Sequence, residues 1–263
     1  MDLELRGKAA IVGGASEGLG YAIAQLLAEE GATVVMVARR EAPLAAAAAR
    51  IASATGARTV PLPADIRIAA DCARIVQSAV SACGRLDVLV NNDGAPPLGD
   101  LPSFDDAAWT AAVEQNLMSV VRLSRAAMPH LRASGAGRIV NIAALSALQP
   151  LPKFGLSVAT WAGVIGYAKT LSLEVARDKV TVNTICPGRF ATGRLAKVFG
   201  GGADAKGGLD DDALAKLVAQ VPMGRLGDPR ELAGLVAFLC SPLAAYMTGC
   251  VLHADGGRRA SVS

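Results

Sequence analysis

The fold is decided by the stretch from Lys8 to Leu27, which reads KAAIVGGASEGLGYAIAQLL. Residues 9–12 form an apolar run, as expected for a strand buried on both faces of a sheet. Glycines follow at positions 13, 14, 18 and 20, and apolar residues then recur at 23, 26 and 27 with helical spacing. The stretch therefore predicts a strand, a glycine-rich turn and a helix.

This turn favours an anion-binding site. Glycines allow the backbone to approach a pyrophosphate, and a helix N-terminus directs free N–H groups and a partial positive charge towards it. Gly14, Gly18 and Gly20 have the spacing G-x-x-x-G-x-G rather than G-x-G-x-x-G. The alternative, a glycine turn without a ligand, stays open on these residues alone.

Composition narrows the function classes. The chain has 263 residues, of which 52% are hydrophobic and 4% aromatic, and its net charge is +3. No basic run stands out, so we expect no nucleic-acid partner. There is no signal-peptide core and no apolar stretch of membrane length, so we expect a cytoplasmic protein without a membrane partner. The five cysteines lack paired metal-ligand spacing, so we expect reduced thiols and no metal site.

Strand and helix patterns alternate along the chain, which predicts a parallel sheet with helices on both faces. The expected fold class is α/β: a single-domain Rossmann fold over residues 1–263, with a doubly wound parallel sheet. Residues 193–220 depart from this alternation, because 200–208 are glycine-rich and 210–218 look like a short helix. We expect a flexible substrate lid there. The expected strands are 9–12, 33–38, 59–63, 86–90, 138–142, 180–185 and 249–253, and the later helices are 42–54, 71–82, 107–131, 157–176 and 230–239.

Several motifs occur in the order found in the short-chain dehydrogenases/reductases, and the chain resembles that family over nearly its whole length. Besides the glycine turn, these are Asn91-Asn92-Asp93-Gly94, Asn116, Pro187-Gly188 with Thr192, and Asp255-Gly256-Gly257. The resemblance implies a nicotinamide cofactor and a small-molecule substrate. The cofactor-binding residues that it implies are Gly14, Ser16, Gly18, Leu19, Gly20, Asn92, Gly94, Pro187, Gly188 and Thr192, with Asp65 and Ile66 at the adenine.

The end of the second strand favours NADP(H) over NAD(H). NAD enzymes of the family usually carry an acid there, which binds the ribose hydroxyls, whereas this chain has Ala38 followed by Arg39. Arg39 offers a bidentate fork to a 2′-phosphate. Glu17 argues the other way, because many NADP enzymes of the family have a basic residue at that place.

The chain departs from the family at the catalytic residues, of which only Asn116 is retained. The usual Ser is replaced by Ala144, and the usual Tyr-x-x-x-Lys pair falls on Ser157 and Trp161. A serine hydroxyl is a far weaker acid than a phenol, and an indole carries no positive charge. We therefore expect Asn116, Ser146 and Ser157 to act with water, with Lys153 and Asp93 as weaker candidates. A divergent branch of the family that also lacks the pair has similar segments at 93–99, 156–159 and 192–195.

Three functions stay open on the sequence. The first is an NADP(H)-dependent oxidoreductase with a rebuilt acid/base site. The others are a nucleotide-binding pseudoenzyme without redox turnover, and a lyase or isomerase that uses the same pocket. The weak net charge suggests a mostly apolar substrate. The family's two long helices pack across two-fold axes, so the resemblance also implies a homodimer or homotetramer.

Overall fold

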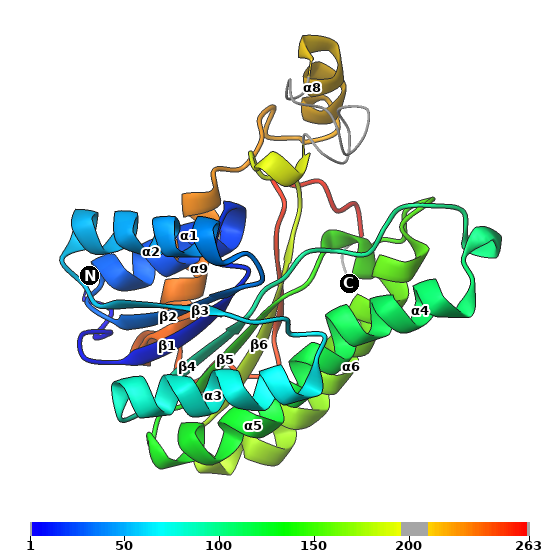
Figure 1. Ribbon diagram of the computed structural model, residues 1–263. Helices are drawn as coiled ribbons and strands as arrows, with labels where there is room; N and C mark the ends of the chain where they lie inside the picture. The colour runs from blue at the N-terminus through cyan, green and yellow to red at the C-terminus, as the bar shows by residue number, and fades with distance from the viewer. Residues whose placement is uncertain (1, 196–209, 262–263) are drawn as a thin grey trace.

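The computed structural model describes residues 2–195 and 210–261 (Figure 1). Seven strands form one sheet in the order β3-β2-β1-β4-β5-β6-β7, and all neighbouring strands run parallel. The strand order reverses between β1 and β4, which places a crevice beyond the carboxyl ends of these two strands. The strands are β1 (Ala9–Gly13), β2 (Thr33–Ala38), β3 (Thr59–Pro63), β4 (Val88–Asn91), β5 (Arg138–Ile142), β6 (Thr181–Pro187) and β7 (Val251–Ala254).

Helices cover both faces of the sheet, as predicted for a doubly wound Rossmann fold (Figure 1). One face carries α1 (Gly18–Glu29), α2 (Glu41–Thr55) and α9 (Pro229–Cys240). The other carries α3 (Ala69–Cys83), α5 (Ser119–Ala133) and α6 (Gly155–Val175). Two separate hydrophobic cores fill the spaces between the sheet and these layers. Every residue of β1 and β5 is buried, as expected for strands covered on both sides.

The predicted continuous helix over 107–131 is wrong in its middle. The structure has α4 (Asp106–Ala112), a π-helical segment (Val113–Met118) and then α5. Ser119 Oγ donates a hydrogen bond to the carbonyl of Gln115, so a side chain satisfies a backbone acceptor within the widened turn. Such π segments are frequent at functional sites, and this one carries Asn116.

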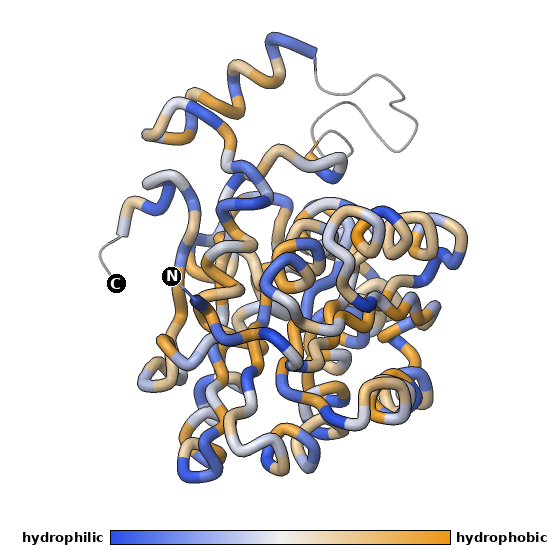
Figure 2. The backbone as a smooth tube through the Cα atoms, turned by 90° about the vertical axis from the view of Figure 1, so that its left-hand side faces the viewer, coloured by the Kyte–Doolittle hydropathy of each residue, from blue (hydrophilic) through white to orange (hydrophobic). Residues whose placement is uncertain are grey.

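The lid predicted over residues 193–220 falls in the segment after β6, and its function as a lid stays a prediction. Helix α8 (Asp211–Val218) confirms the expected helix there, and Asp210 caps it by accepting a hydrogen bond from the amide of Ala213 at 2.6 Å. In both views α8 projects away from the sheet, and it alternates hydrophilic and hydrophobic residues (Figure 2). The glycine-rich residues 200–208 lie outside the described residues. Within the described ranges, no helix is both long and apolar enough to cross a membrane.

Candidate active site

The glycine turn after β1 is closely packed. A Cβ on Gly20 would lie 2.3 Å from the carbonyl oxygen of Gly14, and a Cβ on Gly14 would lie 2.7 Å from Asn92 Nδ2. Gly14 and Gly18 also have φ angles of 58° and 61°, which a side chain would strain. The turn and the N-terminus of α1 therefore allow the close backbone approach that a pyrophosphate requires.

Asn92 holds this turn in place. Its Nδ2 donates to the carbonyl oxygen of Gly13 at 2.9 Å, which ties the loop after β4 to the end of β1. The neighbouring Asn91 donates to Asn141 Oδ1 at 2.8 Å, in the register that pairs β4 with β5. Glu17 is the N-cap residue of α1, and its side chain makes no capping hydrogen bond to the first amides of the helix.

A cavity of about 320 Å³ runs along this turn. The cavity lies in the crevice at the carboxyl ends of β1, β2, β3 and β4. Most of the residues that the sequence assigned to the cofactor meet here. They are Gly14, Ser16, Gly18, Leu19, Gly20, Arg39, Asp65, Ile66, Asn92, Gly94 and Thr192. This cavity is called the cofactor cavity below.

At the β2 end of the cofactor cavity, Glu17 does not stand alone as the carboxylate that was expected to disfavour NADP(H). Glu17 pairs with Arg40, at 3.5 Å between Oε1 and Nη2, and both side chains are largely exposed. The carboxylate expected to weaken a 2′-phosphate site is therefore partly neutralised. Arg39 is exposed and lines the cavity. The residues at this end consequently fit a phosphate-bearing adenosine.

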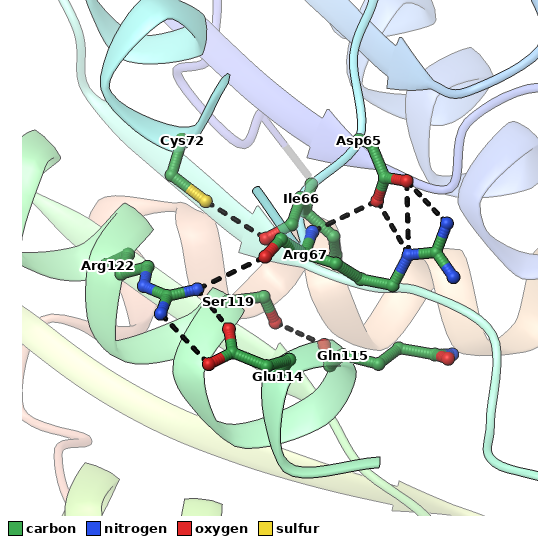
Figure 3. Close-up of polar contacts among 8 residues, drawn as sticks. All are labelled: Asp65, Ile66, Arg67, Cys72, Glu114, Gln115, Ser119 and Arg122. Atoms are coloured by element: carbon green, nitrogen blue, oxygen red, sulfur yellow. Dashed lines mark hydrogen bonds and ion pairs between the residues drawn. The ribbon is translucent and has the colours of Figure 1, made fainter. Parts of the chain in front are cut away.

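Asp65 and Ile66 lie in the loop between β3 and α3 (Figure 3). The carboxylate of Asp65 accepts hydrogen bonds from the Arg67 side chain, with an Nη2–Oδ2 distance of 2.5 Å, and this pairing lowers the pKa of Asp65. The Asp65 amide in turn donates to Asp71 at 2.8 Å. Since both cavity-lining residues belong to this loop, its internal bonds fix the predicted adenine end.

The same loop is tied to the π-helical segment (Figure 3). Arg122 on α5 donates to the carboxylate of Glu114 in that segment, and also to the backbone carbonyl of Arg67 at 3.3 Å. Cys72 on α3 donates to the Ile66 carbonyl at 3.1 Å. One guanidinium therefore links the predicted adenine loop to the turn that carries Asn116.

A second cavity, of about 370 Å³, continues from the first and is called the substrate cavity below. The two cavities share Leu19, Asn92, Asp93, Gly94, Thr192 and Arg194. Pro187, Gly188, Ser146 and Ser157 line only the substrate cavity. Gly188 packs against the backbone of Asp255, because a Cβ there would lie 2.7 Å from its Cα. The D-G-G stretch thus supports the wall formed by Pro187 and Gly188.

Two predicted catalytic serines reach this cavity. Ser146 lies in the short 3₁₀ turn Leu145–Ala147 and is 3% exposed, and its Oγ has no hydrogen-bond partner among the described residues. Ser157 lies on the first turn of α6 and is also 3% exposed. Both serines line the same cavity. A buried hydroxyl without a protein partner is suited to bind a substrate oxygen.

Asn116 is placed differently from the two serines. It is fully buried, its Nδ2 donates to Thr160 Oγ1 at 2.8 Å, and it lines neither cavity. Thr160 Oγ1 in turn donates to the Leu156 carbonyl at 2.7 Å. Asn116 therefore anchors the turn of α6 that carries Ser157 and Trp161. The sequence could not show this bond, because Thr160 belongs to a distant helix.

Trp161 is the residue that the family resemblance predicts at the place of the lysine. Its side chain is 3% exposed, it packs with Val120, Val164 and Cys186, and it lines the substrate cavity. Its Nε1 has no acceptor among the described residues.

The two weaker catalytic candidates are placed differently from each other. Lys153 is exposed and does not line the substrate cavity. Asp93 lines both cavities, and burial raises its pKa.

Sequence reasoning missed the three arginines of the substrate cavity, Arg189, Arg194 and Arg258. Each follows or lies near a motif already identified at the carboxyl end of a strand. Arg189 comes directly after Pro187-Gly188, and Arg258 directly after Asp255-Gly256-Gly257. Their position next to these motifs was the available signal. The prediction of a mostly apolar substrate did not consider these three arginines.

Comparisons with known proteins agree over the whole chain. The family model for enoyl-(acyl carrier protein) reductase matches residues 14–259. The 3-oxoacyl-acyl-carrier-protein reductase FabG of Vibrio harveyi is 38% identical over 255 residues, covering 97% of this chain and 98% of that protein. The FabG of Escherichia coli K12 is 37% identical with the same coverage.

Two solved structures are similarly close. The L-sorbose reductase of Gluconobacter frateurii, complexed with NADPH and L-sorbose, has a TM-score of 0.94 and 34% identity, covering 100% of both chains. YwfH, an NADPH-dependent reductase involved in bacilysin biosynthesis, has a TM-score of 0.90 and 29% identity. It covers 97% of this chain and 99% of its own.

Proposed function

The chain belongs to the short-chain dehydrogenase/reductase family, and on that premise we propose that it is an NADP(H)-dependent oxidoreductase. Its substrate is a small carbonyl or alcohol compound, and its acid/base site is non-standard. The observation that carries this proposal is the continuity of the two cavities. A cofactor along the glycine turn would reach the wall that holds Ser146 and Ser157.

The residues fit the cofactor. Gly14, Gly18 and Gly20 line the cofactor cavity, and Arg39 can form charge-assisted hydrogen bonds to a 2′-phosphate. Pro187, Gly188 and Thr192 would flank the nicotinamide. The similar sorbose reductase is complexed with NADPH and YwfH is NADPH-dependent, which supports the preference over NADH.

The chain's own groups would stabilise the reacting oxygen. The residues of the glycine turn would hold NADPH, and the chemistry available there would be hydride transfer to the carbonyl carbon. The oxygen then gains negative charge, and Ser146 and Ser157 would donate hydrogen bonds to it. Neither serine nor a neutral water molecule is acidic enough to release a proton near neutral pH, so the proton would come from hydronium or a buffer acid of the solvent, relayed through water in the cavity. Asn116 acts as a positioning residue, because it holds α6 through Thr160.

Trp161 favours one alternative function. An uncharged indole in the place of the lysine cannot lower the pKa of a neighbouring acid or bind a ribose as an ammonium group does. A protein that binds the nucleotide without redox turnover would tolerate this replacement. A lyase or isomerase using the same cavity is the third hypothesis, and it would turn over substrate without changing the cofactor's redox state.

Titration with NADPH and NADH tests the proposal. Nicotinamide fluorescence and thermal shift should both report binding, because a ligand of the native state raises the melting temperature. We expect tighter binding of NADPH, followed by its oxidation in a screen of small carbonyl compounds. Binding without oxidation would support the pseudoenzyme, and absence of binding by either cofactor would overturn both nucleotide-based functions.

We also propose a homodimer or homotetramer built on α5 and α6. On α6 the small residues Ala159, Ala162 and Gly166 are exposed, and a Cβ on Gly166 would meet nothing within 4 Å. Such a surface allows two helices to approach closely. Sedimentation at the monomer mass would contradict this.

The five cysteines are free, which supports a reducing compartment such as the cytoplasm.

A further inference from the structure

Two residues of the substrate cavity each carry a buried polar atom without a hydrogen-bond partner among the described residues. The atoms are Ser146 Oγ and Trp161 Nε1, and each residue is 3% exposed. The large majority of buried side-chain polar atoms are paired with protein or with ordered water. A bound molecule or a water is therefore the partner that these two atoms are free to take.

The fold brings these two residues to one wall. The 3₁₀ turn that carries Ser146 packs on α6, and its Ala147 packs against the small hydrophobic cluster that holds Trp161. Ser157 lies four residues before Trp161 on α6, a spacing that places two side chains on the same face of a helix. Ser146, Ser157 and Trp161 therefore border the same cavity from two packed elements.

The free N–H of Trp161 has room for an organic partner in the substrate cavity. Trp161 also borders a smaller internal cavity of about 10 Å³, lined mainly by apolar residues of the sheet and of α5. That volume is at the lower limit for one water molecule. The substrate cavity of about 370 Å³ is within the usual range for small-molecule sites. A ligand that meets Trp161 Nε1 therefore comes from the substrate cavity.

The chemistry of the indole defines what that ligand must offer. An indole N–H donates one hydrogen bond and accepts none, so its partner is an acceptor such as a carbonyl oxygen. Apolar side chains, Leu145, Phe154 and Phe190 among them, line the same cavity. In such surroundings a fixed donor interacts more strongly with a charged oxygen than it would in water. An uncharged N–H can therefore stabilise an oxygen that gains negative charge.

We propose that Trp161 is a catalytic residue whose indole N–H donates a hydrogen bond to the oxygen of the substrate carbonyl, alongside Ser146 and Ser157. The inference rests on the proposed function, because the oxygen gains its charge only when a hydride adds to the carbonyl carbon. The two electrons of that hydride form the new C–H bond and are lost by the reduced nicotinamide, while the C=O π pair moves to the oxygen. Trp161 keeps its own proton, and a proton from the solvent completes the hydroxyl group.

The variant Trp161→Phe removes the N–H and keeps an apolar ring in the cluster. We expect kcat for NADPH oxidation, with cyclohexanone or the best substrate of the carbonyl screen, to fall by ~100-fold, as loss of one oxyanion donor does. KM should change little, because the bond strengthens in the transition state. Trp109→Phe is the matched control, since Trp109 lies on α4 and does not line the cavity. Thermal unfolding and NADPH titration show whether both variants are folded.

The indole N–H signal of Trp161 gives a second test that needs no turnover. Trp109 and Trp161 are the two tryptophans of the chain, so Trp109→Phe identifies the Trp161 signal in ¹⁵N-labelled protein. Cyclohexanone is added up to its solubility limit, with NADP⁺ and without cofactor. Methylenecyclohexane, which has a CH₂ group in place of the carbonyl oxygen, is the matched compound. We expect a downfield shift of the Trp161 proton with the ketone and none with the hydrocarbon.

The outcomes separate this inference from the proposed function. NADPH oxidation with the same kcat in Trp161→Phe and Trp109→Phe would overturn the role of Trp161 and leave the reductase intact. No shift of the Trp161 proton, or an equal shift with methylenecyclohexane, would also overturn it. A shift with the ketone alone, in a wild type that oxidises no NADPH, would support Trp161 as a donor to the carbonyl oxygen and refute the reductase.

Discussion

The cofactor cavity and the substrate cavity share a wall, but their polar groups are satisfied differently. Along the cofactor cavity, Asn92 bonds Gly13, Arg40 pairs with Glu17, and Asp65 pairs with Arg67. On the substrate cavity, Ser146 Oγ and Trp161 Nε1 are buried without a partner among the described residues.

This difference shows which cavity has its polar groups held by bonds within the protein before a ligand binds. A cavity whose polar groups bond one another is more rigid before a ligand arrives, and the backbone amides of the glycine turn and the exposed Arg39 remain to bind it. A buried hydroxyl or indole N–H without a partner is costly, by about 1–3 kcal/mol. Such groups are stabilised when a ligand supplies the missing partner. The substrate cavity is therefore the region that ligand identity and mutation should alter most.

The largest expected effect is a gain of activity at the substrate cavity. The triple variant Ala144→Ser, Ser157→Tyr and Trp161→Lys puts the family's residues at the three cavity-lining positions that the resemblance predicts for them. General acid–base catalysis typically contributes ~10²–10⁴-fold, so kcat for carbonyl reduction should rise by that order. Steady-state NADPH oxidation measures it.

The control for this gain is the pair Ala144→Ser and Ser157→Tyr without the lysine. It adds a phenol and leaves Trp161, so its rate should stay well below that of the triple variant. Reduction that appears only in the triple variant, from an inactive wild type, would identify the natural protein as a non-reductase. A triple variant that binds NADPH but never exceeds the wild type would show that Trp161 does not occupy the lysine's place.

The second effect is a loss at the cofactor cavity. Gly20→Val places a Cβ 2.3 Å from the Gly14 carbonyl and 2.7 Å from Asn92 Nδ2. Displacing the turn should weaken NADPH binding by ~100-fold, as a misplacement of about 1 Å can. Overpacking should lower stability by about 1–3 kcal/mol. Fluorescence titration and urea unfolding give the two values.

Gly234→Ala is the matched control, because a Cβ at this position on α9 meets nothing within 4 Å. It should leave NADPH binding unchanged and raise stability by up to ~1 kcal/mol through helix propensity. If Gly20→Val bound NADPH normally, the glycine turn would not be the pyrophosphate site.

The sequence predicted the cofactor cavity better than the substrate cavity for a physical reason. The glycine turn is local, so strand, turn and helix can be recognised within twenty residues or so. Arg189 and Arg258 meet only because β6 and β7 are neighbours in the sheet, and Asn116 meets Thr160 only because α6 packs against the π-helical segment. The π-helical turn itself was missed because its apolar spacing continues that of the flanking helices.

The third effect concerns cofactor choice. Arg39→Met removes the guanidinium expected at the 2′-phosphate, so NADPH affinity should fall by ~10–100-fold while NADH affinity changes little. Arg40→Met is the comparison, since Arg40 also lines the cofactor cavity but is paired with Glu17. Arg40→Met should weaken NADPH binding less, by exposing it to the Glu17 carboxylate. Equal losses of NADPH and NADH in Arg39→Met would assign Arg39 to the adenine or to the fold.

The smallest expected effect lies where the two cavities join, at Asp93. Burial raises the pKa of this carboxyl above its ordinary value of 3.8, and the ionised form would repel an anionic cofactor. Protonation removes that charge, so NADP⁺ should bind more tightly as the pH falls through the raised pKa. Asp93→Ala should tighten binding near neutral pH by up to ~10-fold, the scale of one like charge a few ångströms away.

Calorimetric titration with NADP⁺, which survives mild acid, measures both effects of Asp93. The 2′-phosphate also titrates, near pH 6. The contribution of Asp93 is therefore measured as the difference in NADP⁺ affinity between wild type and Asp93→Ala at each pH. Asp100→Ala is the control, because Asp100 is exposed and lines neither cavity. A constant difference across the acid range would mean that Asp93 stays ionised throughout. In that case the ionised Asp93 carboxylate would be stabilised by the nearby Arg194 guanidinium, and we would assign Asp93 to substrate binding and not to cofactor binding.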